Sequence, residues 1–305
     1  MLELLHNAND TGQVQSVKTF DFKTMYTSIP HKQLKQRPGN LIDTTFHGCD
    51  CKYIVDLSTR RTRWSKQPNP HGNHTTADQL KRDLNYLIDN LYFVAGPHVF
   101  QQVVGIPMGT NCAPLLADLF LYTFESKFMR KLTRESIRLA RASSHEARYI
   151  DDLLVINDEV LEDRLNDIYP SEMVVQRQNE SDQACDFLDL SIWIEDDLFR
   201  WKLYDKRDSF DFPIRLYPWA DSNISRITGH GVYAGQLIRF VRNSTNILDF
   251  QARHSTLVQK LIAQGWCRAE LMKQARRVWS KHRLIVTKLT NSWRPFASAF
   301  NRNFD

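Results

Sequence analysis

The sequence has few cysteines and no long apolar run. No segment approaches the roughly 18 apolar residues that would span a bilayer, and the start lacks the pattern of a secretory signal. Five cysteines, an odd number scattered over 305 residues, argue against a disulfide framework and for reduced thiols. These absences predict an intracellular protein without a membrane association.

Repeats and low-complexity tracts are also missing, but charge is unevenly distributed. An apolar content of 42% suffices for one large domain or two smaller ones. The net charge is +5, yet the segment from Arg226 onward carries 14 Lys or Arg against 3 Asp or Glu, so it nets +11 and the first 225 residues net −6. A basic stretch often only solvates a helix face, but this one is a candidate for binding a polyanion.

Apolar spacing predicts two helices in the first half of the chain. One runs from Asp78 to Tyr92, with Thr76 or Asp78 as its N-cap. The other begins at Pro114, a residue that suits the first turn, and repeats apolar residues at three and four positions as far as Phe128. Both helices need a partner surface to cover their apolar stripes.

Two hairpins and a helical end complete the expected organisation. Residues 147–156 place two adjacent aspartates between β-prone flanks, and residues 187–204 alternate around a turn at Asp196-Asp197. Long helical patterns follow Gly231. We therefore predict an α+β protein with domains at 1–225 and 226–305, joined by a connector at 216–223.

Three acidic residues are the first candidates for chemistry. Asp21 lies between apolar residues, where a lone aspartate is usually a cap or turn former. Asp151 and Asp152 are more informative, because two carboxylates at a hairpin tip repel unless a cation lies between them. An exposed Asp-Asp turn is nevertheless common.

Three segments, in order, resemble the motifs of reverse transcriptases. They are FDFKTMYTSIP at 20–30, GIPMGTNCAP at 105–114 and YIDD at 149–152. The residues of these segments are most similar to those of Penelope-like retroelements, whose polymerases are related to telomerase. The likeness continues through FLDL at 187–190, LYDKRD at 203–208 and GVY at 231–233, and covers roughly residues 17 to 285.

The resemblance implies a right-hand polymerase, with a palm of antiparallel sheet and packed helices followed by a helical thumb. Asp21 and Asp151 would chelate two Mg²⁺ ions, for which Mn²⁺ could substitute, with Asp152 beside them and the carbonyl of Phe22 as a further ligand. Nucleotidyl transfer needs one ion at the primer 3′-hydroxyl and one at the triphosphate, and hard ions prefer carboxylate oxygens.

The resemblance also assigns substrate contacts. Tyr26 matches the bulky gate that excludes a ribose 2′-hydroxyl, which implies a preference for deoxynucleotides; otherwise such a tyrosine is usually packing. Met108 would contact the incoming nucleotide by packing, and Gly109 would let the chain pass close to the nascent base pair. Ala113-Pro114 would open the helix beneath it.

Nucleic-acid contacts are expected around the hairpin and in the basic region. Tyr149, Lys206 and Arg207 would contact primer or template, although a solvated charge pair at 206–207 is equally plausible. The thumb candidates are Arg239, Arg242, Arg276 and Arg277. The implied partners are an RNA template, a DNA primer, their heteroduplex and dNTPs, with the nucleus favoured over the cytoplasm.

One other constellation offers five zinc-type ligands, but its spacing fits no common zinc motif. Surface-loop residues are the favoured interpretation. The ligands are His47, Cys49, Cys51, His71 and His74.

The chain departs from the family at both ends. Only twenty residues precede Asp21, so the fingers are essentially missing, and no GIY-YIG nuclease motif follows Arg283. We therefore expect a truncated copy with weak or no activity. The alternatives are a non-catalytic nucleic-acid-binding remnant, an RNA-copying RNA polymerase, which usually has Gly before its paired aspartates, and a purely structural α+β protein.

Overall fold

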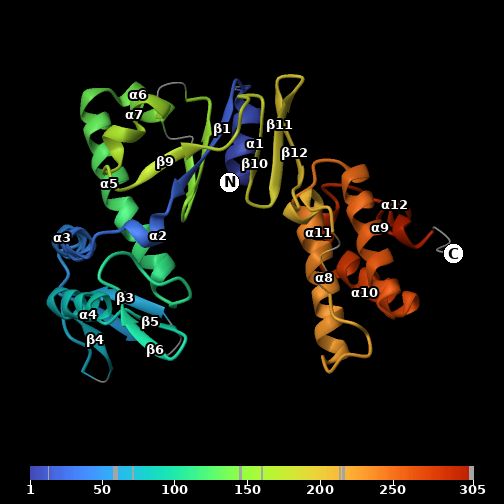
Figure 1. Cartoon of the computed structure of the whole chain (residues 1–305). Helices are drawn as coiled ribbons and strands as arrows, with labels where there is room; N and C mark the ends of the chain where they lie inside the picture. The colour runs from blue at the N-terminus through green and yellow to red at the C-terminus, as the bar shows by residue number, and fades with distance from the viewer. Residues whose placement is uncertain are drawn as a thin grey trace. The chain divides into compact units, whose positions relative to one another are not determined.

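The computed structural model describes residues 1–12, 14–57, 61–70, 72–143, 146–158, 161–212, 214 and 217–301. The chain forms two compact units (Figure 1): unit 1 combines Met1–Thr19 with Asn179–Asp305, and unit 2 is Phe20–Gln178. Each unit has its own core and is described by itself.

A four-stranded sheet of order β7-β8-β1-β9 forms the centre of unit 2. The antiparallel pairs are β7 with β8 and β1 with β9. The strands are β1 (Val17–Lys23), β7 (Glu146–Tyr149), β8 (Asp152–Ile156) and β9 (Val174–Arg177).

Two helices bury one face of this sheet. Phe20, Phe22, Leu153 and Val155 point from β1 and β8 into the core of unit 2. They share it with apolar residues of α5 (Ala113–Glu135) and α7 (Leu161–Ile168). Since successive side chains of a strand point to opposite faces, the residues between them lie on the other face of the sheet.

The remaining elements of unit 2 are helices and short antiparallel strands. Helices α3 and α4 pack against each other, and α3 also packs against α5. The elements are α2 (Met25–Ser28), α3 (His31–Gly48), β2 (Tyr53–Leu57), β3 (Arg61–Ser65), β4 (His74–Thr75), α4 (Ala77–Asp89), β5 (Tyr92–Ala95), β6 (His98–Gln101) and α6 (Ile137–Ala142).

Both helices predicted for the first half of the chain are present. The hydroxyl of Thr76 accepts a hydrogen bond from the Gln79 amide at 3.3 Å, so Thr76 rather than Asp78 is the N-cap of α4. Helix α5 has Pro114 in its first turn. Together with the antiparallel sheets, they confirm the α+β prediction.

Unit 1 combines a three-stranded sheet with a bundle of helices. The sheet has the order β10-β11-β12, and the turn between β11 and β12 is formed by Asp196 and Asp197 at φ 50° and 56°, as a type I′ hairpin requires. This hairpin was predicted from the sequence. The elements are α1 (Leu2–Thr11), β10 (Ala184–Phe187), β11 (Leu190–Glu195), β12 (Leu198–Leu203), the 3₁₀ helix η1 (Lys206–Ser209), α8 (Arg226–Arg242), α9 (Ile247–Ala263), α10 (Arg268–Lys281), α11 (Arg283–Val286), α12 (Trp293–Phe296) and η2 (Ser298–Phe300).

The division into units differs from the boundary expected near residue 225. Leu203 at the end of β12 is buried in one core with Tyr233 and Leu237 of α8, so this sheet belongs with the helices that follow it. The expected connector at 216–223 lies partly outside the described residues, because residue 216 is not among them. Which residues form a palm and a thumb stays a prediction.

No helix in the described part of the chain combines the length and apolar character needed to cross a bilayer.

Candidate active site

Strand β1 presents Asp21 on the face of the sheet that α5 and α7 do not cover. Its neighbours Phe20 and Phe22 are 2% and 3% exposed and point into the core, so alternation turns Asp21 the other way. The register pairs Asp21 with Gln176 on β9. Asp21 is only partly buried, which leaves its carboxylate accessible.

The β7–β8 hairpin carries the acidic pair Asp151-Asp152 and presents Asp152 on the same face as Asp21. Tyr149 and Asp152 are the last paired residues, and Ile150 and Asp151 form the two-residue turn. Because Leu153 points into the core, Asp152 and its partner Tyr149 point to the opposite face, as Asp21 does. β8 and β1 are neighbours in the sheet.

The turn of this hairpin is strained. Ile150 has φ 59°, a left-handed conformation that is unusual for a β-branched residue. Its carbonyl accepts a hydrogen bond from Arg148 Nη1 at 3.0 Å, and its side chain packs against the core of unit 2. Strain of this kind persists where surrounding contacts impose it, and it is common at functional sites.

The charge of Asp151 acts on Asp21, so the two acidic segments lie near each other. The pKa of Asp21 is raised, first by burial and then by the charge of Asp151, while the amide of Phe22 acts in the opposite direction. The pKa of Tyr26 is also raised, by burial and by the charges of Asp151 and Tyr149. Asp21, Tyr26, Tyr149 and Asp151 therefore lie close enough for their charges to interact.

Backbone hydrogen bonds attach the segment 105–114 to the turn that follows β1. The Gly105 amide donates to the Ile29 carbonyl at 2.8 Å, and the Ile106 amide donates to the Tyr26 carbonyl at 2.6 Å. A Cβ on Gly105 would lie 2.4 Å from that Tyr26 carbonyl oxygen, so only glycine fits there. His31 Nε2 lies 2.7 Å from the Gly105 carbonyl.

This attachment holds the predicted substrate-contact residues beside α2. Met108 is 77% exposed. Gly109 has φ 100°, a conformation that requires glycine although a Cβ would meet no atom within 4 Å. Cys112 caps α5, with Ala113 and Pro114 in its first turn. Gly109 therefore has a backbone reason to be glycine, in addition to the role that the resemblance implies.

The described residues include no group of three or more His, Cys, Asp or Glu side chains arranged to hold a metal ion. Among the described residues, His47, Cys49, Cys51 and His74 also form no such group. His71 lies outside the described residues. Asp21 and Asp151 are nevertheless ligands of the type that hard divalent cations prefer, and a cation between them would offset the burial and the repulsion by Asp151 that raise the pKa of Asp21.

The predicted primer and thumb residues of unit 1 differ in their partners. Arg207 is paired with Asp205, with Nε 2.7 Å from Oδ1, and Arg239 is paired with Asp189, with Nε 2.8 Å from Oδ2. Lys206 and Arg242 are exposed, and no ion pair to them occurs among the described residues. Lys206 and Arg242 are thus the more available of the four cations.

A polar network that the sequence did not predict supports the hairpin from its core side. Arg148 of β7 donates to Glu125 and Asp118 of α5, with Nη1 2.7 Å from Asp118 Oδ1. The Tyr169 hydroxyl donates to Glu125 at 2.8 Å. Glu125 falls on the buried line of α5, and such an isolated acid on an apolar helix face is the sequence signal that could have indicated a cationic partner.

Glu146 is the second unpredicted residue of this region. It starts β7, its pKa is raised to about 8 by burial and by the charges of Asp158 and Glu125, and its Oε1 has no hydrogen-bond partner. A carboxyl group in this environment is neutral at pH 7.

Comparison with known proteins shows a similarity of fold but no match in sequence. No protein-family model matches the sequence, and no curated protein matches it. The solved structure of telomerase from Candida albicans in complex with the TWJ fragment of telomeric RNA is similar over 98% of this chain and 50% of its own, with TM-score 0.53 and 12% identity. The structure of apo telomerase from Candida tropicalis matches 98% of this chain and 48% of its own, at 12% identity and with TM-score 0.47. The fold of this chain is therefore similar to that of the Candida albicans telomerase, and the chain spans about half the length of these structures.

Proposed function

We propose that this chain is the reverse-transcriptase domain of a retroelement, an RNA-directed DNA polymerase that adds dNTPs to a primer 3′-hydroxyl. The observation that carries the proposal is that Asp21 of β1 and Asp151, in the turn that precedes the neighbouring strand β8, lie close enough for their charges to interact. The telomerase-like fold supports it. The sequences of the three motifs favour a Penelope-like retroelement as the source of this chain.

The acidic residues have distinct positions in this proposal. Asp21 and Asp151, with Asp152 and the Phe22 carbonyl beside them, would hold two Mg²⁺ ions, or Mn²⁺ in their place. When bound, these ions would supply activation of the hydroxyl and neutralisation of triphosphate charge. The network of Arg148 and Glu125 fixes the strand that ends at Tyr149, and so fixes where Asp151 presents its carboxylate.

Tyr26 and the segment attached to it would shape the nucleotide site. Tyr26 would exclude a ribose 2′-hydroxyl by bulk, and its carbonyl holds the Ile106 amide. Exposed Met108 would pack on the incoming nucleotide, and the left-handed backbone of Gly109 would pass beside the nascent pair. The partners would be an RNA template, a DNA primer and their heteroduplex, contacted by Tyr149 and by the basic helices of unit 1.

Primer extension tests the proposal. A labelled DNA primer on an RNA template, with Mg²⁺ and dNTPs, should be extended by the wild-type chain, but only weakly, as predicted from the sequence. Asp21→Asn and Asp151→Asn should each reduce extension by about a hundredfold or more. Asp83→Asn, which changes an exposed aspartate of α4, is the matched control and should keep wild-type activity. No extension by a folded wild-type chain would contradict the proposal.

A second candidate is a nucleic-acid-binding protein without catalysis. It is favoured by the finding that no three carboxylates in the described residues are arranged as a metal site. It predicts salt-sensitive binding of RNA–DNA hybrids without extension, and binding that survives the double change Asp151→Asn with Asp152→Asn.

A further inference from the structure

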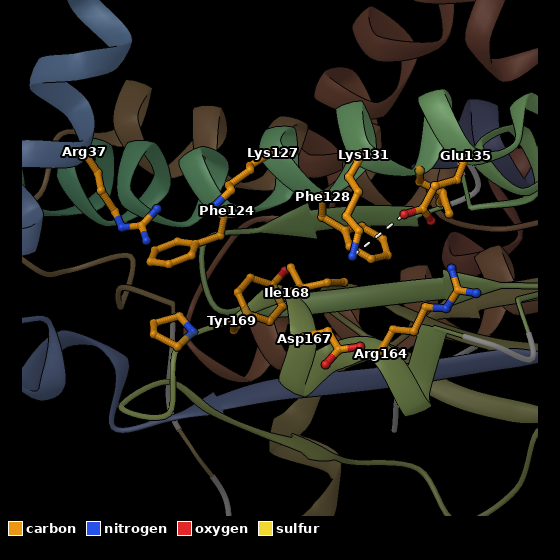
Figure 2. A pocket seen from close by; sticks show the side chains of 12 residues that line it. Arg37, Phe124, Lys127, Phe128, Lys131, Glu135, Arg164, Asp167, Ile168 and Tyr169 are labelled. Carbon is orange, nitrogen blue, oxygen red and sulfur yellow. Dashed lines mark ion pairs between the residues drawn. The ribbon is translucent and has the colours of Figure 1, made fainter.

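A basic groove lies along the C-terminal half of α5 in unit 2 (Figure 2). It consists of two hollows of about 630 and 650 Å³, which share Arg37, Lys127, Lys131 and Glu135 among their lining residues. The hollows are therefore parts of one surface, which we name the α3–α5 groove.

The groove contains more cations than its own acids neutralise. Its lining has two acids, Glu135 and Asp167, against six cations: Arg37, Lys127, Arg130, Lys131, Arg134 and Arg164. Lys131 lies 3.9 Å from Glu135. In the described part of the chain, the other five cations have no carboxylate within 4.0 Å.

The spacing on α5 argues against an ordinary solvated face. Lys127, Arg130, Lys131 and Arg134 stand at positions i, i+3, i+4 and i+7, so they occupy one side of the helix. Like charges at this spacing destabilise a helix by a few tenths of a kcal/mol per pair. An anionic ligand would turn this repulsion into attraction.

Arg37 adds a partly buried cation from the facing helix. Its guanidinium lies 3.6 Å from the centre of the Phe124 ring, and burial lowers its pKa. A guanidinium with reduced hydration and no carboxylate partner favours an external anion. Arg37 lines both hollows, and Figure 2 shows it at one end of the groove, beside Phe124.

The two hollows differ in chemistry. One adds the Asn40 amide and the Ser126 hydroxyl to its cations, and such groups contact phosphate oxygens. The hydroxyls of Thr44 and Thr123, which also line it, donate to the carbonyls of Asn40 and Phe120. The other has an apolar and aromatic floor, where Figure 2 shows Phe124 and Phe128 of α5 opposite Ile168 and Tyr169. Cations beside aromatic rings are the combination that holds backbone and bases of a single strand.

We propose that the α3–α5 groove binds single-stranded nucleic acid, with phosphates along Lys127, Arg130 and Arg134 and a base against Phe128. The site is separate from the candidate active site. Lys127 follows Ala113 by 14 residues, about 21 Å along the axis of α5. The proposal goes beyond the proposed function, because it requires neither metal ions nor nucleotide addition.

The test measures binding of fluorescent oligouridylate and oligothymidylate 12-mers to the full chain, in EDTA, over a range of NaCl concentrations. The groove variant combines Lys127→Gln, Arg130→Gln and Arg134→Gln. The control variant combines Lys35→Gln, Lys66→Gln and Lys81→Gln, which removes the same charge from lysines already paired with Asp89, Asp50 and Asp43. Glutamine keeps α5 helical, and circular dichroism checks it.

The groove variant should bind at least tenfold more weakly than wild type at 0.1 M NaCl. Its slope of log K against log[NaCl] should be shallower by about 2, since three single-strand phosphate contacts contribute roughly 0.7 each. The control should keep the wild-type slope. Phe128→Leu should weaken binding without changing the slope, because stacking releases no counterions.

Three outcomes would overturn the proposal: an unchanged slope in the groove variant, an equal loss in the control, or competition by polyglutamate as effective as that of oligouridylate at equal charge. The last result would assign the groove to an acidic polypeptide. A preference for either 12-mer supports the proposal and identifies RNA or DNA as the strand. Because no extension is measured, failure of the polymerase proposal leaves this test unaffected.

Discussion

Arg148 and Glu125 form a forked ion pair beneath the hairpin that carries Asp151. Arg148 Nε lies 2.5 Å from Oε1, and Nη2 lies 3.0 Å from Oε2. The Arg148 side chain is 9% exposed. The two residues are 23 positions apart in the sequence, and their pair fixes β7 against α5.

Removal of Arg148 should destabilise unit 2. Arg148→Met leaves Glu125 without its cation, which should lower the free energy of unfolding by about 3 kcal/mol. Arg130→Met changes an exposed arginine of α5 and should cost less than about 0.5 kcal/mol. Urea unfolding followed by circular dichroism measures both, and equal losses would refute the role of the pair. Primer extension by Arg148→Met should fall as well.

Glu146 should make unit 2 less stable as pH rises from about 4.5 to about 8. Burial and the charges of Asp158 and Glu125 raise the pKa of its carboxyl from 4.5 to about 8. The unfolded chain therefore releases this proton first, and stability should fall as pH rises from about 4.5 to about 8, by up to roughly 1.4 kcal/mol per pH unit. Glu146→Gln should remove this dependence in urea titrations at several pH values, whereas exposed Glu135→Gln should keep it.

His254 should make unit 1 sensitive to acid. Its Nδ1 donates to the Phe296 carbonyl at 3.2 Å, so Nε2 accepts from the Tyr233 hydroxyl at 2.8 Å. Burial lowers the pKa of His254 from 6.5 to about 4, so its contribution is complete above pH 6.5 and is lost as pH falls toward 4.

His254→Gln should weaken that acid dependence, and exposed His6→Gln should leave it intact. Tryptophan fluorescence is the suitable signal, because Trp64 is the single tryptophan of the 7 that lies outside unit 1. A wild-type unfolding free energy that does not change between pH 7 and pH 4.5 would rule the prediction out.

Two glycines of α8 should respond to alanine in opposite directions. A Cβ on Gly229 would lie 2.0 Å from Cη2 of the buried Trp266, whereas a Cβ on Gly235 meets nothing within 4 Å. Gly229→Ala should therefore lower stability by about 2 kcal/mol or more through overpacking. Gly235→Ala should raise it by about 0.5 to 1 kcal/mol. Thermal unfolding of both variants is the measurement, and a stable Gly229→Ala would contradict the packing.

Tyr26 should control the choice of sugar if the chain extends primers. Tyr26→Ala removes the bulk beside Asp151 and should reduce the preference for dNTPs over NTPs by at least about tenfold, or 1.4 kcal/mol. Tyr26→Phe keeps the ring and should keep the preference. Competition between dATP and ATP in single-nucleotide addition gives the ratio, and an unchanged ratio in Tyr26→Ala would exclude a gating role.

Local patterns predicted the elements of the site. The β-prone flanks of Asp151-Asp152 predicted the hairpin, and the apolar period after Pro114 predicted α5. Their interaction with Asp21 could be expected only from the motif resemblance, because charge coupling between residues 130 positions apart leaves no local signal.

Long-range polar partners could not be predicted. Arg239 was expected at nucleic acid, and nothing in its neighbourhood indicated that Asp189, 50 positions earlier, would neutralise it. Arg207 was expected there too, but its partner Asp205 is only two positions away in the sequence. The α3–α5 groove depends on packing that brings Arg37 beside Lys127. The unit division depends on which core receives Leu203, a choice that strand periodicity leaves open.

The two-residue turn at Ile150 and Asp151 fixes the register between β7 and β8. One inserted residue would shift β7 by one position against β8 and exchange the faces of Arg148 and Tyr149. The arginine would then face solvent and the tyrosine would face Glu125. Changes of length at this tip should therefore be far less tolerated during the evolution of the protein than exchanges of side chains, because an insertion dismantles the support and the presentation of the acidic pair together.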